Sequence, residues 1–350
     1  MVQTDVLDAK IPFLAAALDL PQAHLALRQA IPDLRRVTAA TLVRHKPERR
    51  ALIAYTVETA TDAFTALGKI RAKGTDWRTY RLQQALWHQG FAADSADGYS
   101  VPEPIGVVPV WQMWLQRQVP GIPATELLPT DRGVALAGRI AHLAHKLHRT
   151  NIPAAKNHTL ADELNILHQR LPLVSQDLPH LQPGIEQVLD ACTELVASTS
   201  VVWLPCCGIH RDFYGDQVLV ESGQGQSLGC DRIWLVDLDL YCQGHPALDI
   251  GNFVAHITEQ SLRQGVDAAA LADREKVLQE TFVAAWIASN PELANRAEDL
   301  RYAIALYAAL TLVRHIHISH RIASRRSLTR EIVALCKSRL QTLLDQRKRH

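Results

Sequence analysis

The sequence predicts an α+β protein with two lobes, a small one built on an antiparallel sheet and a larger one that is mostly helical. Residues 34–120 contain strand-like runs around a single helical stretch. From residue 121 onward, apolar residues recur mainly at helical spacing. Short strand-like runs return in residues 201–253, so this block differs from the helices on either side of it.

Length and charge bound the classes of function. The chain has 350 residues, which is long enough for two hydrophobic cores, and 47% of them are apolar. Lys and Arg number 37 against 36 Asp and Glu, so the formal net charge is +1. Such a balance gives no overall field toward nucleic acid or an anionic membrane, and we expect neither as a partner. The oligomeric state is left open.

The N-terminal stretch MVQTDVLDAKIPF carries acidic residues early and lacks the basic start and apolar core of a signal peptide. No apolar run reaches the roughly 18 residues that a membrane-spanning helix needs. The six cysteines show no paired metal-ligand spacing. We therefore expect a cytoplasmic protein whose cysteines form neither disulfides nor a zinc site.

The small lobe is expected at residues 34–118, after an N-terminal helical segment at 1–33 that Pro21 breaks in two. The larger lobe is expected at 119–350, with a hairpin at 208–240. The elements expected in the small lobe are two strands at 35–58 around the turn HKPER, a third strand at 62–73, a helix at 76–90 that Gly90 ends, and one or two strands at 103–121. The helices expected in the larger lobe are 132–150, 158–172, 184–198, 246–262, 267–289, 296–321 and 327–347.

Oxygen-bearing side chains gather in the stretches GIHRDFYGDQVLV (208–220) and RIWLVDLDLYCQGHPALDIGNF (232–253). The short apolar runs at 218–220 and 233–236 are joined by a segment rich in turn residues, which predicts a hairpin. Such a hairpin would bring Asp212, Gln217 and Asp237 near one another. On an extended chain, Asp239 would point to the same side as Asp237.

Gathered carboxylates repel one another, and a hard cation such as Mg²⁺ relieves that repulsion. A carboxylate beside a metal-bound nucleotide could also orient a hydroxyl group for phosphoryl transfer. The sequence His-Arg-Asp with an amide five residues after the Asp matches the catalytic-loop spacing of protein kinases. The alternative is a surface turn in which Arg211 and Arg232 neutralise the acids.

These two stretches resemble the aminoglycoside phosphotransferase and choline kinase-like family, which has a protein-kinase-like fold. The matching residues are HRDFYGDQVLV, then the apolar strand ending at Asp237, then Gly244, Pro246 and Asp249. The resemblance covers roughly residues 34–320 and is specific in 208–253. It implies an ATP-dependent phosphotransferase that uses Mg²⁺ and moves the γ-phosphate to a hydroxyl of a small metabolite.

The resemblance also implies roles for single residues in the larger lobe. Asp212 would be the catalytic base or hydroxyl-orienting residue. Gln217 and Asp237 would be metal ligands. His210, Asp239 and Asp249 would have supporting roles, with Asp249 tying the catalytic loop to the helix that follows it.

In the small lobe, Lys69 would contact the nucleotide phosphates, with Lys73 as a competitor for that role. The segment from Gln116 to Val119 would be the hinge that meets the adenine through backbone groups.

Three features depart from the family pattern. The family has Asn where this chain has Gln217. The first hairpin turn, RHKPERR, contains no glycine, so Arg44, Lys46, Arg49 or Arg50 would face the phosphates or be solvated turn charges. The helix at 76–90 contains no Glu to pair with Lys69, and Gln83 or Gln84 is the nearest substitute.

Two histidine-bearing stretches lie outside this motif. His142, His145 and His148 follow one another at intervals of three, and we interpret them as a polar helix flank rather than a zinc site. The stretch RHIHISHRIASRR (314–326) is interpreted as a solvated helix end, with a substrate pocket as the alternative. Because the C-terminal helices are rich in Arg and His, a neutral or anionic acceptor is favoured over a polycationic one.

Three hypotheses remain open from the sequence. The first is a small-molecule kinase. The second is a catalytically silent, kinase-like module that binds nucleotide or scaffolds partners, which the glycine-free turn, the missing helix Glu and Gln217 favour. The third is a nucleic-acid binder that uses residues 314–326, which the near-zero net charge opposes.

Overall fold

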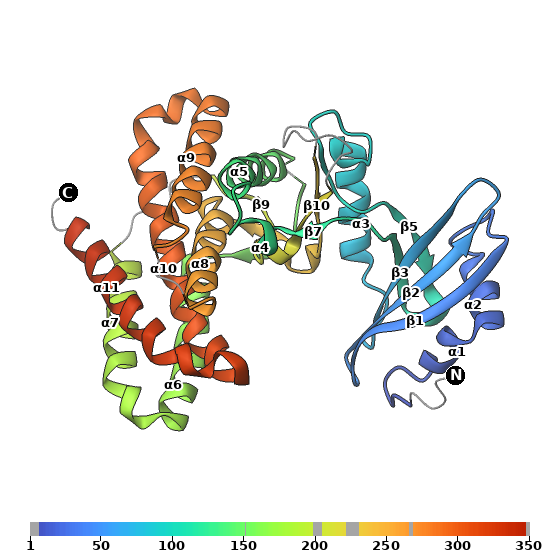
Figure 1. Ribbon diagram of the computed structural model, residues 1–350, viewed down its shortest axis with the longest axis horizontal. Coiled ribbons are helices and arrows are strands. Elements are labelled where there is room, and N and C mark those ends of the chain that lie inside the picture. Colours follow the sequence, from blue (N-terminus) through green and yellow to red (C-terminus); the bar gives the residue numbers. More distant parts are fainter. Residues whose placement is uncertain (1–6, 151, 199–204, 222–230, 266–268, 348–350) are drawn as a thin grey trace. The chain divides into compact units, whose positions relative to one another are not determined.

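The computed structural model describes residues 7–150, 152–198, 205–221, 231–265 and 269–347. Contacts divide the chain into two compact units, and each is described by itself. Unit 1 runs to Gly121 and includes Asp231–Asp239, and unit 2 comprises Ile122–Cys230 and Leu240–His350. The predicted α+β class is confirmed, since unit 1 is built on an antiparallel sheet and unit 2 is mostly helical (Figure 1). The turn of the expected hairpin falls on residues 222–230, outside the described residues.

Unit 1 contains a five-stranded antiparallel sheet in the order β1-β2-β3-β6-β5 (Figure 1). Its strands are β1 (Arg36–Lys46), β2 (Arg50–Glu58), β3 (Ala63–Arg71), β5 (Pro104–Val108) and β6 (Met113–Arg117). In β3, Lys69 pairs with Leu52 on one side and with Trp114 on the other. The third strand therefore runs through the middle of the sheet.

Two short helices, α1 (Leu14–Leu18) and α2 (Leu20–Leu27), pack on the sheet through one continuous core that includes Leu14, Leu27 and Tyr55. The break between them is at Asp19, whose side chain accepts a hydrogen bond from Gln22 N and caps α2. The segment is divided into two helices as predicted, but the division falls at Asp19, two residues before Pro21. Pro21 lies in the first turn of α2, where its missing N–H costs no helical hydrogen bond.

Unit 1 also contains α3 (Trp77–Leu86), which Asp76 caps, followed by a π-helical turn at Trp87–Phe91 in which Gly90 has a φ of 89°. The two-residue strand β4 (Tyr99–Ser100) pairs in parallel with β11 (Arg232–Leu235). This pairing places 231–239 in unit 1, whereas the sequence analysis assigned the segment to the larger lobe. A short 3₁₀ helix, η2 (Pro109–Trp111), joins β5 to β6.

Unit 2 contains helices close to each range expected from the sequence. They are α4 (Ala124–Leu127), α5 (Gly133–Arg149), α6 (Leu160–Asp177), α7 (Gln182–Ala197), α8 (Ala247–Arg263), α9 (Ala272–Ser289), α10 (Ala297–Arg321) and α11 (Thr329–Arg347). The strands are β7 (Ile122–Pro123), β8 (Asn157–His158), β9 (Cys207–Ile209), β10 (Val218–Glu221) and β12 (Cys242–Gly244), and the 3₁₀ helices are η3 (Pro179–Leu181), η5 (Gly215–Gln217), η8 (Pro291–Arg296) and η9 (Ala323–Leu328). In the described part of the chain, no helix combines the length and hydrophobicity of a membrane span.

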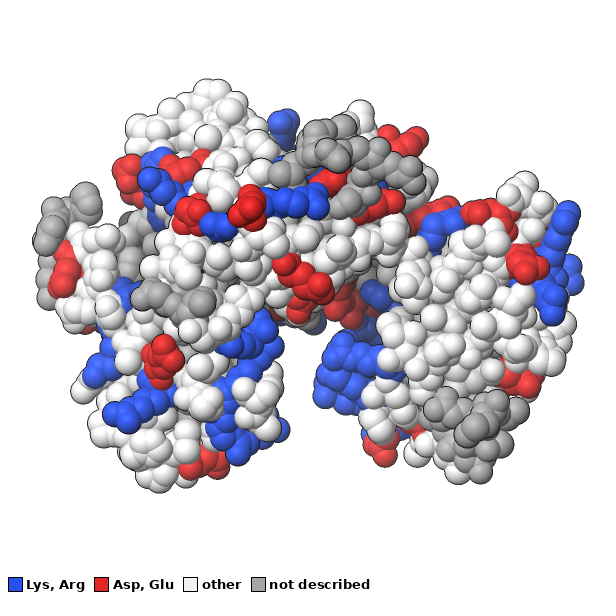
Figure 2. Space-filling view, viewed as in Figure 1, with Lys and Arg blue, Asp and Glu red and all other residues white. Residues whose placement is uncertain are grey.

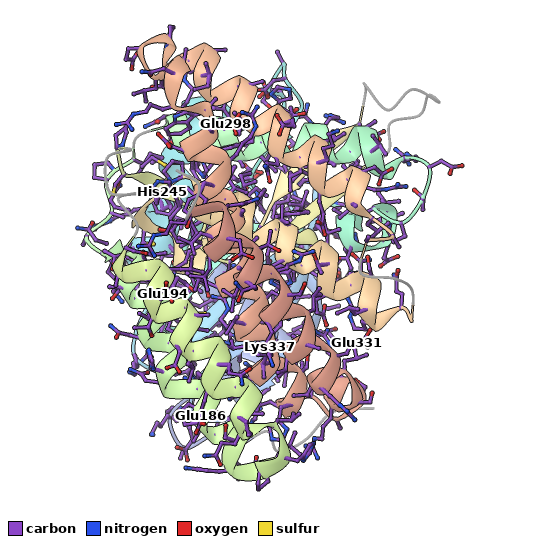
Figure 3. All side chains as sticks on the ribbon, turned by 90° about the vertical axis from the view of Figure 1, so that its left-hand side faces the viewer. Glu186, Glu194, His245, Glu298, Glu331 and Lys337 are labelled. Carbon is purple, nitrogen blue, oxygen red and sulfur yellow. The ribbon has the colours of Figure 1, made fainter. Side chains whose placement is uncertain are left out.

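Helices α7 and α11 lie side by side, with Glu186 and Glu194 of α7 and Lys337 of α11 on their exposed surfaces (Figure 3). Their apolar sides, which include Ile185 and Cys336, are buried. This amphipathic pattern is what the sequence spacing in these helices predicts.

The contact between α8 and α10 is close enough to require a glycine. A Cβ atom on Gly251 would lie 2.6 Å from Tyr307 Cβ and 2.7 Å from the Ala308 backbone nitrogen. Because backbone cannot move aside cheaply, we expect Gly251→Ala to lower stability by roughly 1–3 kcal/mol, measured as a fall in Tm.

Gly138→Ala on α5 is the matched control, because its Cβ would meet Val277 Cγ1 at an ordinary 3.6 Å. Alanine favours a helix over glycine by about 0.5–1 kcal/mol, so this variant should keep or raise Tm. Equal Tm changes in the two variants would contradict the close contact.

Candidate active site

The residues His210–Phe213 form a loop between β9 and η5 in unit 2. Strand β9 pairs with β12, with Cys242 opposite Ile209 and Gly244 opposite Cys207. Arg211 has a φ of 70°, in the left-handed region that non-glycine residues rarely adopt. Such strain persists only where surrounding contacts hold it, and it is found most often at functional sites.

Those contacts come from Asp249, which is fully buried in the first turn of α8. Its Oδ2 accepts from the His210 backbone N–H at 2.8 Å, and its Oδ1 accepts from the Arg211 backbone N–H at 2.7 Å. His148 Nε2 of α5 lies 2.9 Å from Asp249 Oδ2. One carboxylate therefore fixes the backbone of the loop that carries Asp212.

A second anchor of the loop, Asn252, was missed by the sequence analysis. Its Nδ2 donates to the Phe213 carbonyl at 3.0 Å, and its Oδ1 accepts from Arg314 Nη2 of α10 at 2.7 Å. Asn252 follows Asp249 by three residues, so both lie on the same face of α8. That spacing is the signal from which it could have been identified.

Asp212 and Gln217 both belong to unit 2. Asp212 is half-buried, whereas Gln217 is buried at the end of η5. Within the described ranges, the side chains of these two residues make no hydrogen bond or ion pair. A half-buried carboxylate without a partner carries a desolvation cost that a bound ligand can relieve.

Asp212 lines a pocket of about 310 Å³ that is formed within unit 2 by α4, the loop, α8, α10 and η9. We call it the α8–α10 pocket. Its basic side chains are Arg263, Arg314 and Arg325, and its acidic side chains are Asp212, Asp216 and Glu259. His256 and His315 complete its polar wall.

The two histidines of the pocket are packed into an aromatic group. The His256 ring stacks on Tyr214 with centroids 4.4 Å apart and meets the His315 ring edge-on at 4.5 Å. Burial lowers the pKa of His315 to about 3 and holds the pKa of His256 well below its usual range, and the nearby arginines add to both shifts. Both rings are therefore neutral at neutral pH. The interpretation of 314–326 as a solvated helix end is wrong for His315, which is 1% exposed.

Asp237 lies in unit 1, two residues beyond β11, and is half-buried. Its φ is 60°, and Asp239 follows in the 3₁₀ helix η7 (Leu238–Leu240). The expectation that both acids point to one side of an extended chain is therefore wrong. Asp239 accepts from Arg71 Nη2 at 2.5 Å, whereas the Asp237 carboxylate has no partner among the described residues.

The alternative of a surface turn neutralised by Arg211 and Arg232 does not describe Asp212 or Asp237. Arg232 donates instead to Ser95 Oγ at 3.0 Å and to Ser100 Oγ at 2.6 Å, in unit 1. No ion pair joins Asp212 or Asp237 to an arginine within the described ranges.

Lys69 lies on β3 with its Nζ 5.0 Å from the centre of the Trp114 ring. Neither glutamine of α3 replaces the missing Glu partner of Lys69. Gln83 Nε2 donates to the Pro102 carbonyl at 2.7 Å and to Gln116 Oε1 at 3.3 Å, and Gln84 Nε2 donates to Tyr80 Oη. The competing lysine, Lys73, is exposed beyond the end of β3.

The proposed hinge segment begins in β6. Gln116 is buried, and its backbone is paired with Leu67 of β3. Val119 lies beyond the end of the strand and is half-buried.

Basic side chains gather at the β1–β2 end of unit 1 (Figure 2). Lys46 is opposite Arg50 in the β1–β2 hairpin, and the charges of Arg50, Arg44 and Arg49 lower the pKa of Lys46. Arg50 is the register partner of Arg71, which binds Asp239. The glycine-free turn thus carries a cluster of cations.

The interpretation of His142, His145 and His148 as a polar helix flank is wrong for two of the three. His148 is buried against Asp249, and His145 packs edge-on against Phe282 and Trp286 of α9. Burial lowers the pKa of His145 to about 4, and His148 adds to that shift. The contacts of α5 with α9, and of His148 with Asp249, cover these rings, and the sequence of α5 alone does not contain that information.

Among the described residues, no group of three or more His, Cys, Asp and Glu side chains is arranged to hold a metal ion. Mg²⁺ in nucleotide enzymes is commonly held by one or two carboxylates together with water and phosphate oxygens. The unpartnered carboxylate of Asp237 and the amide oxygen of Gln217 are ligands of the type that such an ion takes.

The sequence matches one family of known proteins. The model of the phosphotransferase enzyme family matches residues 78–286. No curated protein gives a significant match to the sequence.

Three solved structures share the fold. A spectinomycin phosphotransferase in complex with ADP and spectinomycin superposes with a TM-score of 0.51 at 10% identity, over 93% of this chain and 98% of the other. A choline/ethanolamine kinase family protein from Mesorhizobium loti gives 0.50 at 17% identity, over 91% and 94%. An amicoumacin kinase in complex with AMP-PNP and Ca²⁺ gives 0.52 at 13% identity, over 90% and 92%.

Proposed function

The chain belongs to the phosphotransferase enzyme family, and on that premise we propose that it transfers the γ-phosphate of ATP to a hydroxyl group of a small molecule. The observation that carries the proposal is the loop at His210–Phe213. Asp249 and Asn252 fix its backbone, and it presents Asp212 without a partner, among the described residues, to the α8–α10 pocket. A fixed loop with one unpaired carboxylate is suited to orienting a reacting hydroxyl.

In this proposal Asp212 accepts a hydrogen bond from the acceptor hydroxyl and takes its proton as the oxygen attacks the γ-phosphorus, while the bond from that phosphorus to the β–γ bridging oxygen breaks and ADP leaves. Gln217 and Asp237 would hold the divalent cation, and Lys69 would contact the nucleotide phosphates. The segment from Gln116 to Val119 meets the adenine. A bound Mg²⁺ would neutralise negative charge on the phosphate oxygens that coordinate it.

The structural relatives support a nucleotide and a small acceptor. Their names include ADP, AMP-PNP, spectinomycin and choline or ethanolamine. The test is transfer of labelled phosphate from ATP into a fractionated cell extract. A labelled small molecule that appears with the wild-type chain and not with Asp212→Ala supports the kinase. Hydrolysis of ATP without any labelled product would argue against phosphoryl transfer to a metabolite.

The second candidate is a silent nucleotide-binding module. It is favoured by the glycine-free β1–β2 turn and by Lys69, which lies over Trp114 and has no carboxylate partner among the described residues. Nucleotide binding that is independent of Mg²⁺, together with no turnover on any fraction, would favour the module.

Asp237 and Asp239 provide a matched pair for testing the cation. Asp239 is paired with Arg71, whereas Asp237 has no partner among the described residues, so only Asp237 is expected to hold the metal. We expect Asp237→Ala to lower turnover by about 100-fold or more, because metal stabilisation of transferring phosphate is worth several kcal/mol.

Titration with EDTA should have the same effect on the wild-type chain. Asp239→Ala should keep most of the turnover and its dependence on Mg²⁺. If the two variants lose turnover equally and keep the same affinity for Mg²⁺, Asp237 has no special role as a ligand.

A further inference from the structure

We propose that the acceptor is an anion, a hydroxyl compound that carries a carboxylate or phosphate group bound by Arg263 and Arg325 in the α8–α10 pocket. This inference rests on the proposed function and specifies its substrate class. Both arginines line the pocket that also contains Asp212. They come from different elements, Arg263 from the end of α8 and Arg325 from η9.

The two arginines have unused hydrogen-bonding capacity. Each guanidinium carries five N–H donors. In the part of the chain that the structure describes, each makes one long contact, with the same carboxylate: Arg263 Nε lies 3.5 Å and Arg325 Nη1 lies 3.4 Å from an oxygen of Glu259. Most of the donors of both side chains are therefore available to a ligand, and paired donors of this kind suit carboxylate and phosphate.

The charge of the pocket favours an anion on the acceptor side. Apart from Asp212, the wall carries three arginines against Asp216 and Glu259. Glu259 is 2% exposed on its side chain and lies between two of the arginines, and Asp216 accepts a hydrogen bond from Thr125 Oγ1. Figure 2 shows basic side chains gathered at the end of unit 2 where η9 and the start of α11 lie. A cationic acceptor would bring like charge against this wall, which is unfavourable.

A further polar group in the pocket is His315. It is 1% exposed, and neither ring nitrogen has a hydrogen-bond partner among the described residues. A buried imidazole without partners retains one donor and one acceptor for a ligand. A hydroxylated anion can use both, because its anionic oxygens accept and its hydroxyl groups donate.

The test uses four probes that share a three-carbon hydroxyl framework and differ in charge: D-glycerate, glycerol 3-phosphate, glycerol and 3-amino-1,2-propanediol. Binding to the full chain is measured by calorimetry with the nucleotide site filled by ADP and Mg²⁺. We expect one or both anions to bind at least about tenfold more tightly than glycerol and the amine. Comparing the affinities for D-glycerate and glycerol 3-phosphate shows whether the pocket prefers a carboxylate or a phosphate group.

Variants assign the binding to the pocket. Arg325→Gln and Arg263→Gln should each weaken binding of the anion by about 10- to 100-fold, as expected for loss of a charged hydrogen bond. Arg330→Gln, an exposed residue outside the pocket, is the control and should leave binding unchanged. Thermal melting of each variant verifies that it is folded, and Arg325→Lys should restore part of the affinity.

Three results would overturn the inference: tighter binding of the amine than of either anion, anion binding that survives both pocket variants, or no anion binding up to tens of millimolar. The same panel in a kinase assay separates this inference from the proposed function. Arginine-dependent anion binding without phosphoryl transfer to any acceptor would contradict the proposed kinase activity and support the anion site. Phosphoryl transfer to a neutral or cationic acceptor that Arg325→Gln does not affect would support the kinase activity and contradict the anion site.

Discussion

Replacing Asp212 with alanine is expected to lower turnover by about 10²- to 10⁴-fold, the range for loss of a positioned general base. The carboxylate lines the α8–α10 pocket and has no partner among the described residues, so its removal breaks no hydrogen bond or ion pair in that part of the protein. Tm and nucleotide affinity should therefore remain close to those of the wild-type chain. The measurements are steady-state kinetics with ATP and the acceptor, nucleotide binding and thermal melting.

Asp216→Ala is the matched control for this variant. Asp216 lines the same pocket, but its Oδ1 already accepts a hydrogen bond from Thr125. We expect a change of no more than about tenfold in turnover, since one exposed hydrogen bond contributes about 1 kcal/mol. If Asp212→Ala turns over at the wild-type rate, the assignment of the base is wrong.

Replacing Asp249 with alanine is expected to be the most destabilising single change among the site residues. The carboxylate is fully buried and makes three hydrogen bonds, to the His210 and Arg211 backbones and to His148. Its removal leaves buried donors unsatisfied, which costs about 3–5 kcal/mol. It also removes the contacts that hold Arg211 at a φ of 70°, so turnover should fall together with Tm.

Asp249→Asn separates the charge from the shape. It keeps the volume but presents an amide to three donors, so we expect a smaller loss of Tm and a large loss of turnover. Asp190 is an exposed acidic residue on α7 and provides the control. Asp190→Ala should lower Tm less than either Asp249 variant does. An unchanged Tm and rate in Asp249→Ala would contradict the anchoring role.

The sequence predicts the fold class well because that class depends on local patterns. The β-strand-like runs in residues 35–73 predict the three strands β1, β2 and β3. The His-Arg-Asp sequence, with Gln217 five residues after the Asp, predicts where Asp212 lies relative to η5. Asn252 was missed, although its spacing from Asp249 on α8 carried the signal.

Features that depend on packing between distant segments could not be predicted. His148 reads as a surface residue in the sequence of α5, and only the contacts of α5 with α9 and with Asp249 bury it. The sequence predicts that Asp237 and Asp239 point to the same side of an extended strand. The left-handed backbone conformation of Asp237 could not be predicted, because no sequence pattern identifies it. The α8–α10 pocket combines residues that are distant in the sequence, and Glu259 and Arg325, which contact each other in it, are 66 positions apart.

A crystal structure with Mg²⁺ and a non-hydrolysable ATP analogue would show whether Asp212, Gln217 and Asp237 serve one metal–nucleotide complex, as we propose. We expect oxygens of Gln217 and Asp237 at about 2.0–2.1 Å from an ion that also contacts the phosphates. We also expect Asp212 to face the terminal phosphate without binding the ion. A nucleotide and ion bound with Asp237 remote from both would contradict this proposal.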